Sequence, residues 1–564
     1  MFVITASDVV SYDGQVVTVC QRLKSVCVAV LLAGCLPASG QATSKPSAAQ
    51  VAYQRGQQAY ASGDVAGAES AFKEAVKLSP RYADAHAALG YVLSAAGDLK
   101  GAEAELRAAI KLEERSAEAH RQLGRVLSQL GSKEEAIVEM RRAVQLAPNR
   151  ADMRDDLGSV FAQQGKYEDA ATAFAEAVRL QPNFAPAHFH LGVAKIQLHQ
   201  FDDAVKQLRS AINFAPEDPA LHSYLAEALG DQGKNAEALQ ELHKSVDLKP
   251  EWFDAQIALG LACQRSADVA CAVAAFEEAV KLRPADANAY NDLGLALIQK
   301  GDAESSIPKF REAVRLMPQD GEIRGNLGIA FLQRADFDSA IDELKAAIQL
   351  SPSSSSLHYN LGLAYKLKDQ FDSAGIELQK AIELNPSLAD AHYTLGVLFW
   401  QRGDFEKATE QLRSAIQSQQ DYAEAYYTLG TVYKQQGKLP EAAAALREAI
   451  RLQPDFAGAH TTLAAVLRLQ GENEQAAEES KAAARVTATT NNLQAATFAT
   501  NSGKRLLSVG DVDGAIAQFR SATKMDDTYA PAHFQLSQAL QRKGALQEAS
   551  KELQRSKELQ NAKP

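Results

Sequence analysis

Histidine is the residue type in this sequence best suited to metal binding or to acid–base chemistry. The chain holds 11 histidines. Eight of them share one position of a repeating unit: His86, His120, His188, His222, His358, His392, His460 and His533. One histidine per unit places neighbouring rings about one helix pair apart, too far for two of them to share a metal ion. We therefore expect these side chains to pack between helices, and we expect no metal site and no cofactor.

A pair of cysteines offers the second possible chemistry. Cys263 and Cys271 lie on the two helices of one predicted hairpin, and a disulfide could join them across the turn. Alternatively, both are small residues at the edge of the core. We favour this interpretation because Cys271 is displaced by about 100° around its helix from the residue that faces the partner helix.

Motifs of known catalytic chemistry are missing from the sequence. It contains no His-Glu-x-x-His and no Gly-x-Ser-x-Gly, and the segment 502–505 lacks both the leading glycine and the hydroxyl of a phosphate-binding loop. The formal net charge of −11 argues against a nucleic-acid-binding surface. We expect a protein that is not an enzyme and has no catalytic residues.

An internal repeat of 34 residues positions all of these side chains. Within each unit, position 8 is small in all 15 copies, position 20 is alanine in 14 and position 27 is alanine in 13. Position 24 is large and apolar almost throughout, and position 32 is proline in ten copies. Small residues at 8 and 20 let two antiparallel helices approach closely, position 24 fills the space beyond them, and proline ends the second helix. Each unit is therefore predicted to be a helix-turn-helix.

Positions 7, 8, 11, 20, 24, 27 and 32 resemble the tetratricopeptide repeat signature over about 515 of the 564 residues. Position 4 is usually histidine or tyrosine here. The resemblance implies an all-α fold, a right-handed superhelical solenoid of about 15 helix-turn-helix repeats. Such a solenoid has no single core, because each hairpin buries its apolar face against its neighbours.

The period also gives the expected boundaries. Repeats 1–13 occupy residues 49–490, and repeats 14 and 15 with a polar C-terminal cap occupy residues 496–564. The five residues 491–495 are extra, and the Thr- and Asn-rich sequence around them is a poor helix former. We expect a hinge or kink there. The alternative is an extended final helical turn.

The N-terminal residues resemble an export signal. Basic Arg22 and Lys24 precede the short apolar run 26–32, and the segment Leu32–Cys35 resembles the box of a bacterial lipoprotein, in which the cysteine is lipidated. We expect a signal peptide over residues 1–35, a linker over residues 36–48, and a periplasmic or outer-membrane protein anchored only by lipid at Cys35. Cleavage near Gly40 would instead give a secreted protein. A wrong interpretation of the signal would give a cytoplasmic one.

The remaining candidate is a surface along the first helices. In this family positions 5, 9 and 12 line the inside of the superhelix, and in repeats 7–12 they are apolar and aromatic. The candidate peptide-binding groove consists of Ile329, Tyr359, Leu363, Tyr393, Val397, Trp400 and Tyr427, with Asn326 and Asn360 beside them. Exposed aromatic side chains at this density are typical of interaction sites. The alternative is that the aliphatic members belong to the core.

The most consistent function is a non-catalytic scaffold or adaptor of the bacterial cell envelope that binds an extended segment of a partner protein. Two alternatives remain open. One is a specificity or regulatory subunit of a separately encoded enzyme such as a glycosyltransferase, because the repeats resemble those fused to such enzymes. The other is a cytosolic co-chaperone. The sequence does not define the partner or the oligomeric state.

Overall fold

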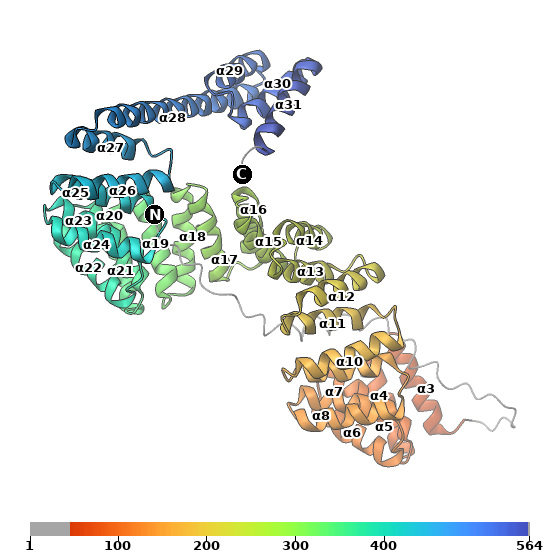
Figure 1. The fold of residues 1–564 in the computed structure, drawn as a ribbon. Helices are drawn as coiled ribbons and strands as arrows, with labels where there is room; N and C mark the ends of the chain where they lie inside the picture. The colour runs from red at the N-terminus through yellow and green to blue at the C-terminus, as the bar shows by residue number, and fades with distance from the viewer. Residues whose placement is uncertain (1–45, 562–564) are drawn as a thin grey trace. The chain divides into compact units, whose positions relative to one another are not determined.

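The computed structural model describes residues 46–561, which form two compact units, 46–317 and 318–561 (Figure 1). The described residues contain 29 α-helices and no strand. The expected signal peptide 1–35 with Cys35, and nearly all of the linker 36–48, lie outside the described residues.

In the first unit, successive antiparallel helix pairs form repeats 1–8. These helices are α3 (Ala48–Ala61), α4 (Val65–Leu78), α5 (Ala83–Ala96), α6 (Leu99–Leu112), α7 (Ala117–Gln129), α8 (Lys133–Leu146), α9 (Ala151–Ala162), α10 (Tyr167–Leu180), α11 (Ala185–Gln197), α12 (Phe201–Phe214), α13 (Pro219–Asp231), α14 (Asn235–Leu248), α15 (Phe253–Arg265), α16 (Val269–Leu282), α17 (Ala287–Gln299) and α18 (Ala303–Leu316).

The second unit holds repeats 9–15. Its helices are α19 (Gly321–Gln333), α20 (Phe337–Leu350), α21 (Ser355–Leu367), α22 (Phe371–Leu384), α23 (Ala389–Gln401), α24 (Phe405–Ser418), α25 (Ala423–Gln435), α26 (Leu439–Leu452), α27 (Ala457–Gln470), α28 (Asn473–Ser508), α29 (Val512–Met525), α30 (Ala530–Lys543) and α31 (Leu546–Asn561). The predicted all-helical repeat architecture is confirmed.

The small residue at position 8 decides how each hairpin packs. At Gly294 an added β-carbon would lie 2.6 Å from the ring of Phe310 at position 24, and at Gly260 it would lie 2.4 Å from the ring of Phe276. Both rings are fully buried. The second helix therefore fits only against a bare backbone at these positions. Alanine replaces this glycine at Ala226 and Ala464, where position 24 is leucine or serine.

The turn between the two helices adopts a left-handed backbone conformation at position 15 of every repeat. Eleven repeats place glycine there, because glycine has no β-carbon to clash at positive φ. The other four hold His199, Ala267, Ala335 and Asp369, with φ between 55° and 59°. The turn geometry is thus kept even where the residue type does not favour it.

The histidines at position 4 join each hairpin to the repeat before it. In all eight, Nε2 lies 2.9–3.2 Å from a main-chain carbonyl oxygen six residues earlier, in the preceding repeat. Nδ1 lies 2.5–2.8 Å from a glutamate or glutamine oxygen on the second helix of the same repeat. Their side chains are buried, so the predicted packing role is confirmed.

The expected hinge at residues 491–495 is wrong as a description of the local backbone. The second helix of repeat 13 and the first helix of repeat 14 are one continuous helix, α28, which runs through these residues. Helical hydrogen bonds continue here despite the low propensity of the Thr and Asn side chains, because the flanking helix needs no new nucleus to extend. Pro308 lies inside α18, which nevertheless begins at Ala303.

The structure contains a disulfide between Cys263 and Cys271, the alternative that the sequence did not favour. The α-carbons lie 5.8 Å apart, within the range that a disulfide spans. The side chains therefore meet across the turn, although Cys271 is displaced around its helix. None of the described helices is long and apolar enough to cross a membrane.

Replacing Gly294 by alanine tests the packing rule. The β-carbon must displace the buried Phe310 ring, so we expect the unfolding free energy to fall by about 1–3 kcal/mol, measured by urea denaturation followed by circular dichroism. Gly375 is the matched control, because a β-carbon there would meet only Leu398, at 3.5 Å. Gly375→Ala should be neutral or stabilising by about 0.5–1 kcal/mol. Equal destabilisation by both changes would contradict the rule.

Candidate functional site

The candidate surface lies on the first helices of repeats 9–12. These helices, α19, α21, α23 and α25, contact one another in sequence along the array, whereas consecutive second helices of these repeats make no contact of comparable extent in the described chain. We call the side chains at positions 5, 9 and 12 of these helices the inner stripe. Its members are Gly325, Ile329, Leu332, Tyr359, Leu363, Lys366, Tyr393, Val397, Trp400, Tyr427, Thr431 and Lys434.

The tyrosines of the inner stripe connect neighbouring repeats. The hydroxyl of Tyr359 is hydrogen-bonded to Thr394, and that of Tyr393 to Thr428, in each case 35 residues further along the chain. Only 2% of Tyr359 is exposed, so the expectation of an exposed aromatic is wrong for this residue. Tyr393 and Tyr427 are half-buried. The rings are thus partly structural, because position 5 lies where one first helix meets the next.

The environment of these hydroxyls is apolar and acidic. Burial raises the pKa of Tyr359 to about 12, and nearby Asp390 adds to the effect. Burial also raises the pKa of Tyr393. Asp390 accepts a hydrogen bond of 2.8 Å from the hydroxyl of Tyr422, whose ring lies 5.0 Å from that of Tyr393. The tyrosines remain neutral donors over the physiological pH range.

The aliphatic and asparagine residues of the predicted groove are more buried than residues that contact a ligand should be. Ile329 is 5% exposed and Val397 is 9% exposed, which supports the alternative that these side chains belong to the core. Leu363 and Asn326 are half-buried. Asn360 is 1% exposed, and its Oδ1 has no hydrogen-bond partner among the described residues. Asn360 therefore cannot contact a peptide in this conformation.

The accessible chemistry of the inner stripe comes from position 12. Trp400 is half-buried, and its Nε1 donates a hydrogen bond of 2.7 Å to Oε1 of Gln435 in the next repeat. Lys366 and Lys434 flank Trp400 at the same position of the neighbouring repeats. Among the described residues no carboxylate pairs with Lys366, and burial lowers the pKa of its ammonium group. The sequence prediction considered only apolar and aromatic residues and therefore left these lysines out. Their recurrence at position 12 could have indicated them.

The first unit has an apolar pocket that was also missed. Phe189, Val193 and Tyr224 line it together with His190, which is hydrogen-bonded through Nδ1 to Oδ1 of Asp155 at 2.8 Å. Phe189 and Tyr224 lie on different first helices, α11 and α13, at positions 5 and 6. In repeats 7–12 the groove was predicted from aromatic residues that recur at the same position. Phe189 and Tyr224 could not be found in this way, because they occupy different positions of their repeats.

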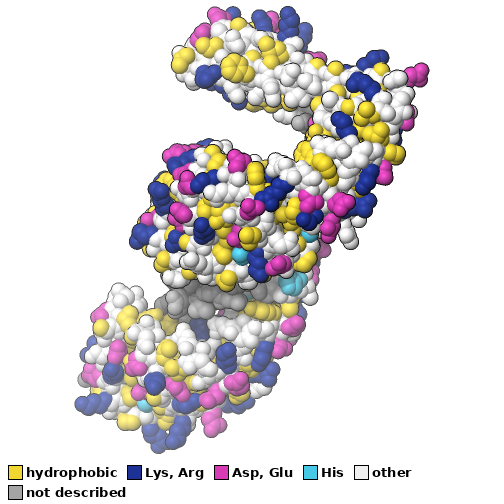
Figure 2. All heavy atoms as spheres, turned by 90° about the vertical axis from the view of Figure 1, so that its left-hand side faces the viewer, with side chains coloured by type: hydrophobic (Ala, Val, Ile, Leu, Met, Phe, Trp, Pro, Cys, Tyr) yellow, Lys and Arg dark blue, Asp and Glu magenta, His cyan; other side chains and the backbone are white. Residues whose placement is uncertain are grey.

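The charges of the described surface are mixed in sign. Lys and Arg side chains alternate with Asp and Glu over the face shown in Figure 2, with no large area of one sign. The early polar residues of the first unit are paired with one another: Arg121 is nearly buried and lies 2.9 Å from Asp152. These pairs leave little free charge for a ligand.

Comparison with known families shows that the chain belongs to the tetratricopeptide repeat family. The matches cover residues 59–113, 88–151, 161–228, 219–244, 257–321, 330–369, 355–388, 399–437, 430–471 and 500–564. Proteins of this fold are in general interaction scaffolds that bind other proteins, and residues 46–561 of this chain have that architecture. A comparison with curated proteins gave no match.

Solved structures with a similar fold include three helical repeat proteins. The Cut9–Hcn1 heterotetramer of APC/C shares 15% identity over 88% of this chain and 97% of that chain, with a TM-score of 0.34. MamA shares 28% identity over 29% of this chain and 96% of its own, with a TM-score of 0.27. YrrB, described as a TPR protein with an unusual peptide-binding site, shares 23% identity over 33% and 95%, with a TM-score of 0.28.

Glu227 lies on the first helix of repeat 6, at position 9, and its carboxyl group can titrate. Burial, and secondarily the negative charge of Asp231, raise the pKa of the Glu227 carboxyl to about 7. A carboxyl whose pKa is higher in the folded chain binds its proton more tightly there than in the unfolded chain. Its protonation therefore favours folding at low pH, and this contribution is lost as the pH rises from about 4.5 to about 7.

Replacing Glu227 by glutamine should remove this contribution. We expect the thermal midpoint of the parent protein to fall between pH 5 and pH 8 by more than that of Glu227→Gln, and the variant to be the more stable of the two at pH 8. Exposed Glu217 on the neighbouring loop is the control, and Glu217→Gln should follow the parent. Parallel pH profiles for the parent and Glu227→Gln would show that the carboxyl is not held in this state.

Proposed function

We propose that the protein is a cell-envelope scaffold that binds an extended, acidic and aliphatic segment of a partner protein along the inner stripe of repeats 9–12. The observation that carries this proposal is the unpaired, partly desolvated Lys366 beside Trp400. A partly buried ammonium group without a counter-ion costs free energy, which an incoming carboxylate recovers in part.

The chemistry around Lys366 sets the class of partner. Lys434 lies two repeats further along, so two cations at position 12 flank the indole of Trp400. Aliphatic partner side chains fit against Leu363 and Trp400, and Asp or Glu side chains fit against the two ammonium groups. The tyrosines at position 5 act as a rigid wall between repeats and hold the spacing of these groups. An extended chain suits such a row of equivalent sites, because both repeat at regular intervals.

A peptide library tests the proposed specificity. Ten-residue peptides selected on the parent protein should be enriched in Asp or Glu next to aliphatic residues. For a selected peptide, the double change Lys366→Glu and Lys434→Glu should weaken binding at least tenfold at low salt, measured by fluorescence anisotropy, because it places carboxylates where the ligand's carboxylates bind.

The control for this experiment carries the same change of net charge elsewhere. Lys380 on α22 and Lys481 on α28 are exposed, and both lie away from the inner stripe. Lys380→Glu with Lys481→Glu should leave the affinity within twofold of the parent. If the control weakens binding as much as the test variant, or if the selected peptides lack acidic residues, the inner stripe is not the binding surface.

We further propose that the protein is exported and anchored to a membrane by lipid at Cys35. The basic residues, the short apolar run and the Leu32–Cys35 box support this location. A lipid anchor on a linker would leave the repeat array free to bind partners away from the membrane surface.

Mass spectrometry of the mature protein tests the anchor. We expect the chain to begin at a lipidated Cys35, and Cys35→Ser should move the protein from the membrane fraction to the soluble fraction. Cys27→Ser, within the proposed signal, should leave the anchoring unchanged. A mature chain that begins at Met1, or just beyond Gly40, would contradict the proposal.

A further inference from the structure

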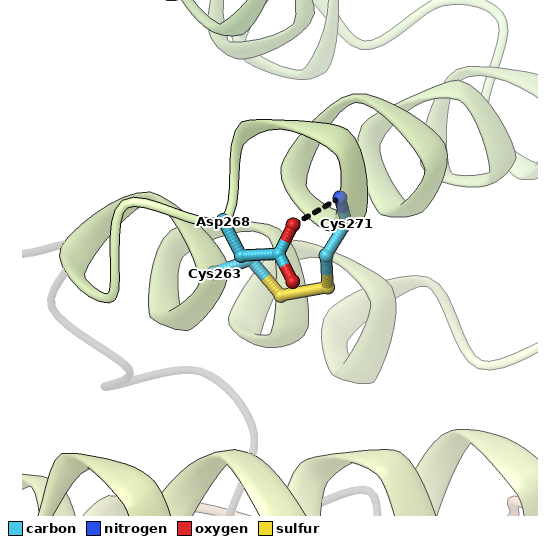
Figure 3. Close-up of a disulfide and its surroundings, with 3 residues drawn as sticks. All are labelled: Cys263, Asp268 and Cys271. Carbon is cyan, nitrogen blue, oxygen red and sulfur yellow. Dashed lines mark hydrogen bonds between the residues drawn. A yellow bond between two sulfur atoms is a disulfide. The ribbon is translucent and has the colours of Figure 1, made fainter. Parts of the chain in front are cut away.

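Three potential metal ligands from two repeats meet at the disulfide of repeat 7, whose two cysteines are among them. His243 on α14, Cys263 on α15 and Cys271 on α16 each offer one ligand atom, and these atoms all lie within 4.8 Å of one another. Cys263 is buried, Cys271 is half-buried and His243 is exposed, so the cluster has one side open to solvent. Figure 3 shows the two sulfurs bonded, with Asp268 accepting a hydrogen bond of 3.1 Å from the backbone N–H of Cys271.

We propose that this cluster is a redox-gated zinc site, a disulfide when oxidised and a Cys₂His site for Zn²⁺ when reduced. Thiolate and imidazole are the ligands that Zn²⁺ prefers. With Zn–S distances of about 2.3 Å, two thiolates on one zinc lie about 3.8 Å apart, so the two sulfurs, which are bonded in this structure, must move apart when Zn²⁺ binds. Bonded sulfurs are only about 2.05 Å apart, so the disulfide and the zinc site exclude each other.

The exchange between the two states balances with a dithiol as the reductant. Its two thiol groups transfer two electrons and two protons to the Cys263–Cys271 disulfide, the sulfur–sulfur bond breaks, and the dithiol is oxidised to its own disulfide. Zn²⁺ then binds to both sulfurs and releases their two protons to the solvent. The neutral imidazole of His243 supplies the third ligand, and water supplies the fourth.

The two states hold different parts of the array together. The disulfide joins α15 to α16 and therefore acts within repeat 7 alone. Zinc would also bind α14 and therefore join repeat 6 to repeat 7. The disulfide spans the turn at Ala267, where alanine at a φ of 56° replaces the glycine of most other repeats.

The site is tested on the full chain in which Cys20, Cys27 and Cys35 are replaced by serine, so that Cys263 and Cys271 are the only cysteines. After reduction and anaerobic removal of the dithiol, Co²⁺ serves as a spectroscopic probe. We expect one Co²⁺ per chain, with thiolate-to-cobalt charge-transfer absorption, and full displacement of Co²⁺ by Zn²⁺. The oxidised protein should bind neither ion.

Three variants separate a built site from chance binding. Cys271→Ser and His243→Ala should each weaken Zn²⁺ binding at least tenfold. The control is exposed His199 in the same unit, and His199→Asn should bind as the parent does, because asparagine tolerates the positive φ of that position.

A measurement on the unsubstituted cysteine pair guards against variants that fail to fold. Zn²⁺ should protect both cysteines of the reduced protein from alkylation, as read by mass spectrometry. The proposal is overturned if the reduced protein binds no Co²⁺ or Zn²⁺, if His243→Ala binds as the parent does, or if Zn²⁺ gives no protection.

Discussion

The close approach of two helices at position 8 is the constraint on which the whole array depends. A glycine there accepts the position 24 side chain directly against its backbone, and the five repeats with phenylalanine at position 24 all have glycine at position 8. Where position 8 is alanine or serine, position 24 is leucine or serine. Phenylalanine at position 24 therefore occurs only opposite a glycine, as a close-packed interior requires. Because each repeat contacts only its neighbours, this local rule applied 15 times builds the fold.

A second recurring interaction links one repeat to the next and has an electrostatic consequence. The Nε2 atom of each position 4 histidine faces a carbonyl oxygen, which only accepts hydrogen bonds, so Nε2 must carry a proton. In six repeats Nδ1 faces a glutamate, as in the 2.6 Å contact of His222 with Glu241. A carboxylate oxygen is likewise an acceptor, so both ring nitrogens of these histidines point at acceptor oxygens.

Glu241 shows the electrostatic effect of such a contact on the carboxylate. Burial acts to raise the pKa of its carboxyl, but hydrogen bonds from Lys244 and His222 outweigh burial, so the pKa lies below its ordinary value. Where histidine is missing, other donors reach the same acceptors. The Nε2 of Gln256 donates to the carbonyl oxygen of Pro250, and Arg324 pairs with Glu343. Glutamine and arginine at position 4 thus each replace one of the two contacts that histidine makes.

The repeats, their helices and the packing role of histidine could be predicted because each rests on a pattern repeated many times. Features that occur once could not. Tyr359 was expected to be exposed because position 5 faces inward, but the contact between neighbouring first helices buries it. His243, Cys263 and Cys271 follow no zinc-binding spacing, since they come together only through the stacking of two repeats. Propensity favoured a break at residues 491–495, yet an existing helix continues through them.

That continuous helix limits how strongly the last two repeats are coupled to those before them. All eight residues 487–494 of α28 are exposed, and the nearest buried residues of this helix on either side are Ala483 and Ala496. Thr487 and Thr490 donate hydrogen bonds to carbonyl oxygens one turn earlier, which competes with the helix rather than adding tertiary contact. In a solenoid, cooperativity passes through the interfaces between neighbours. Across residues 487–494, cooperativity depends on the continuation of helix α28 alone. Thr and Asn have low helix propensity, so this coupling is weak.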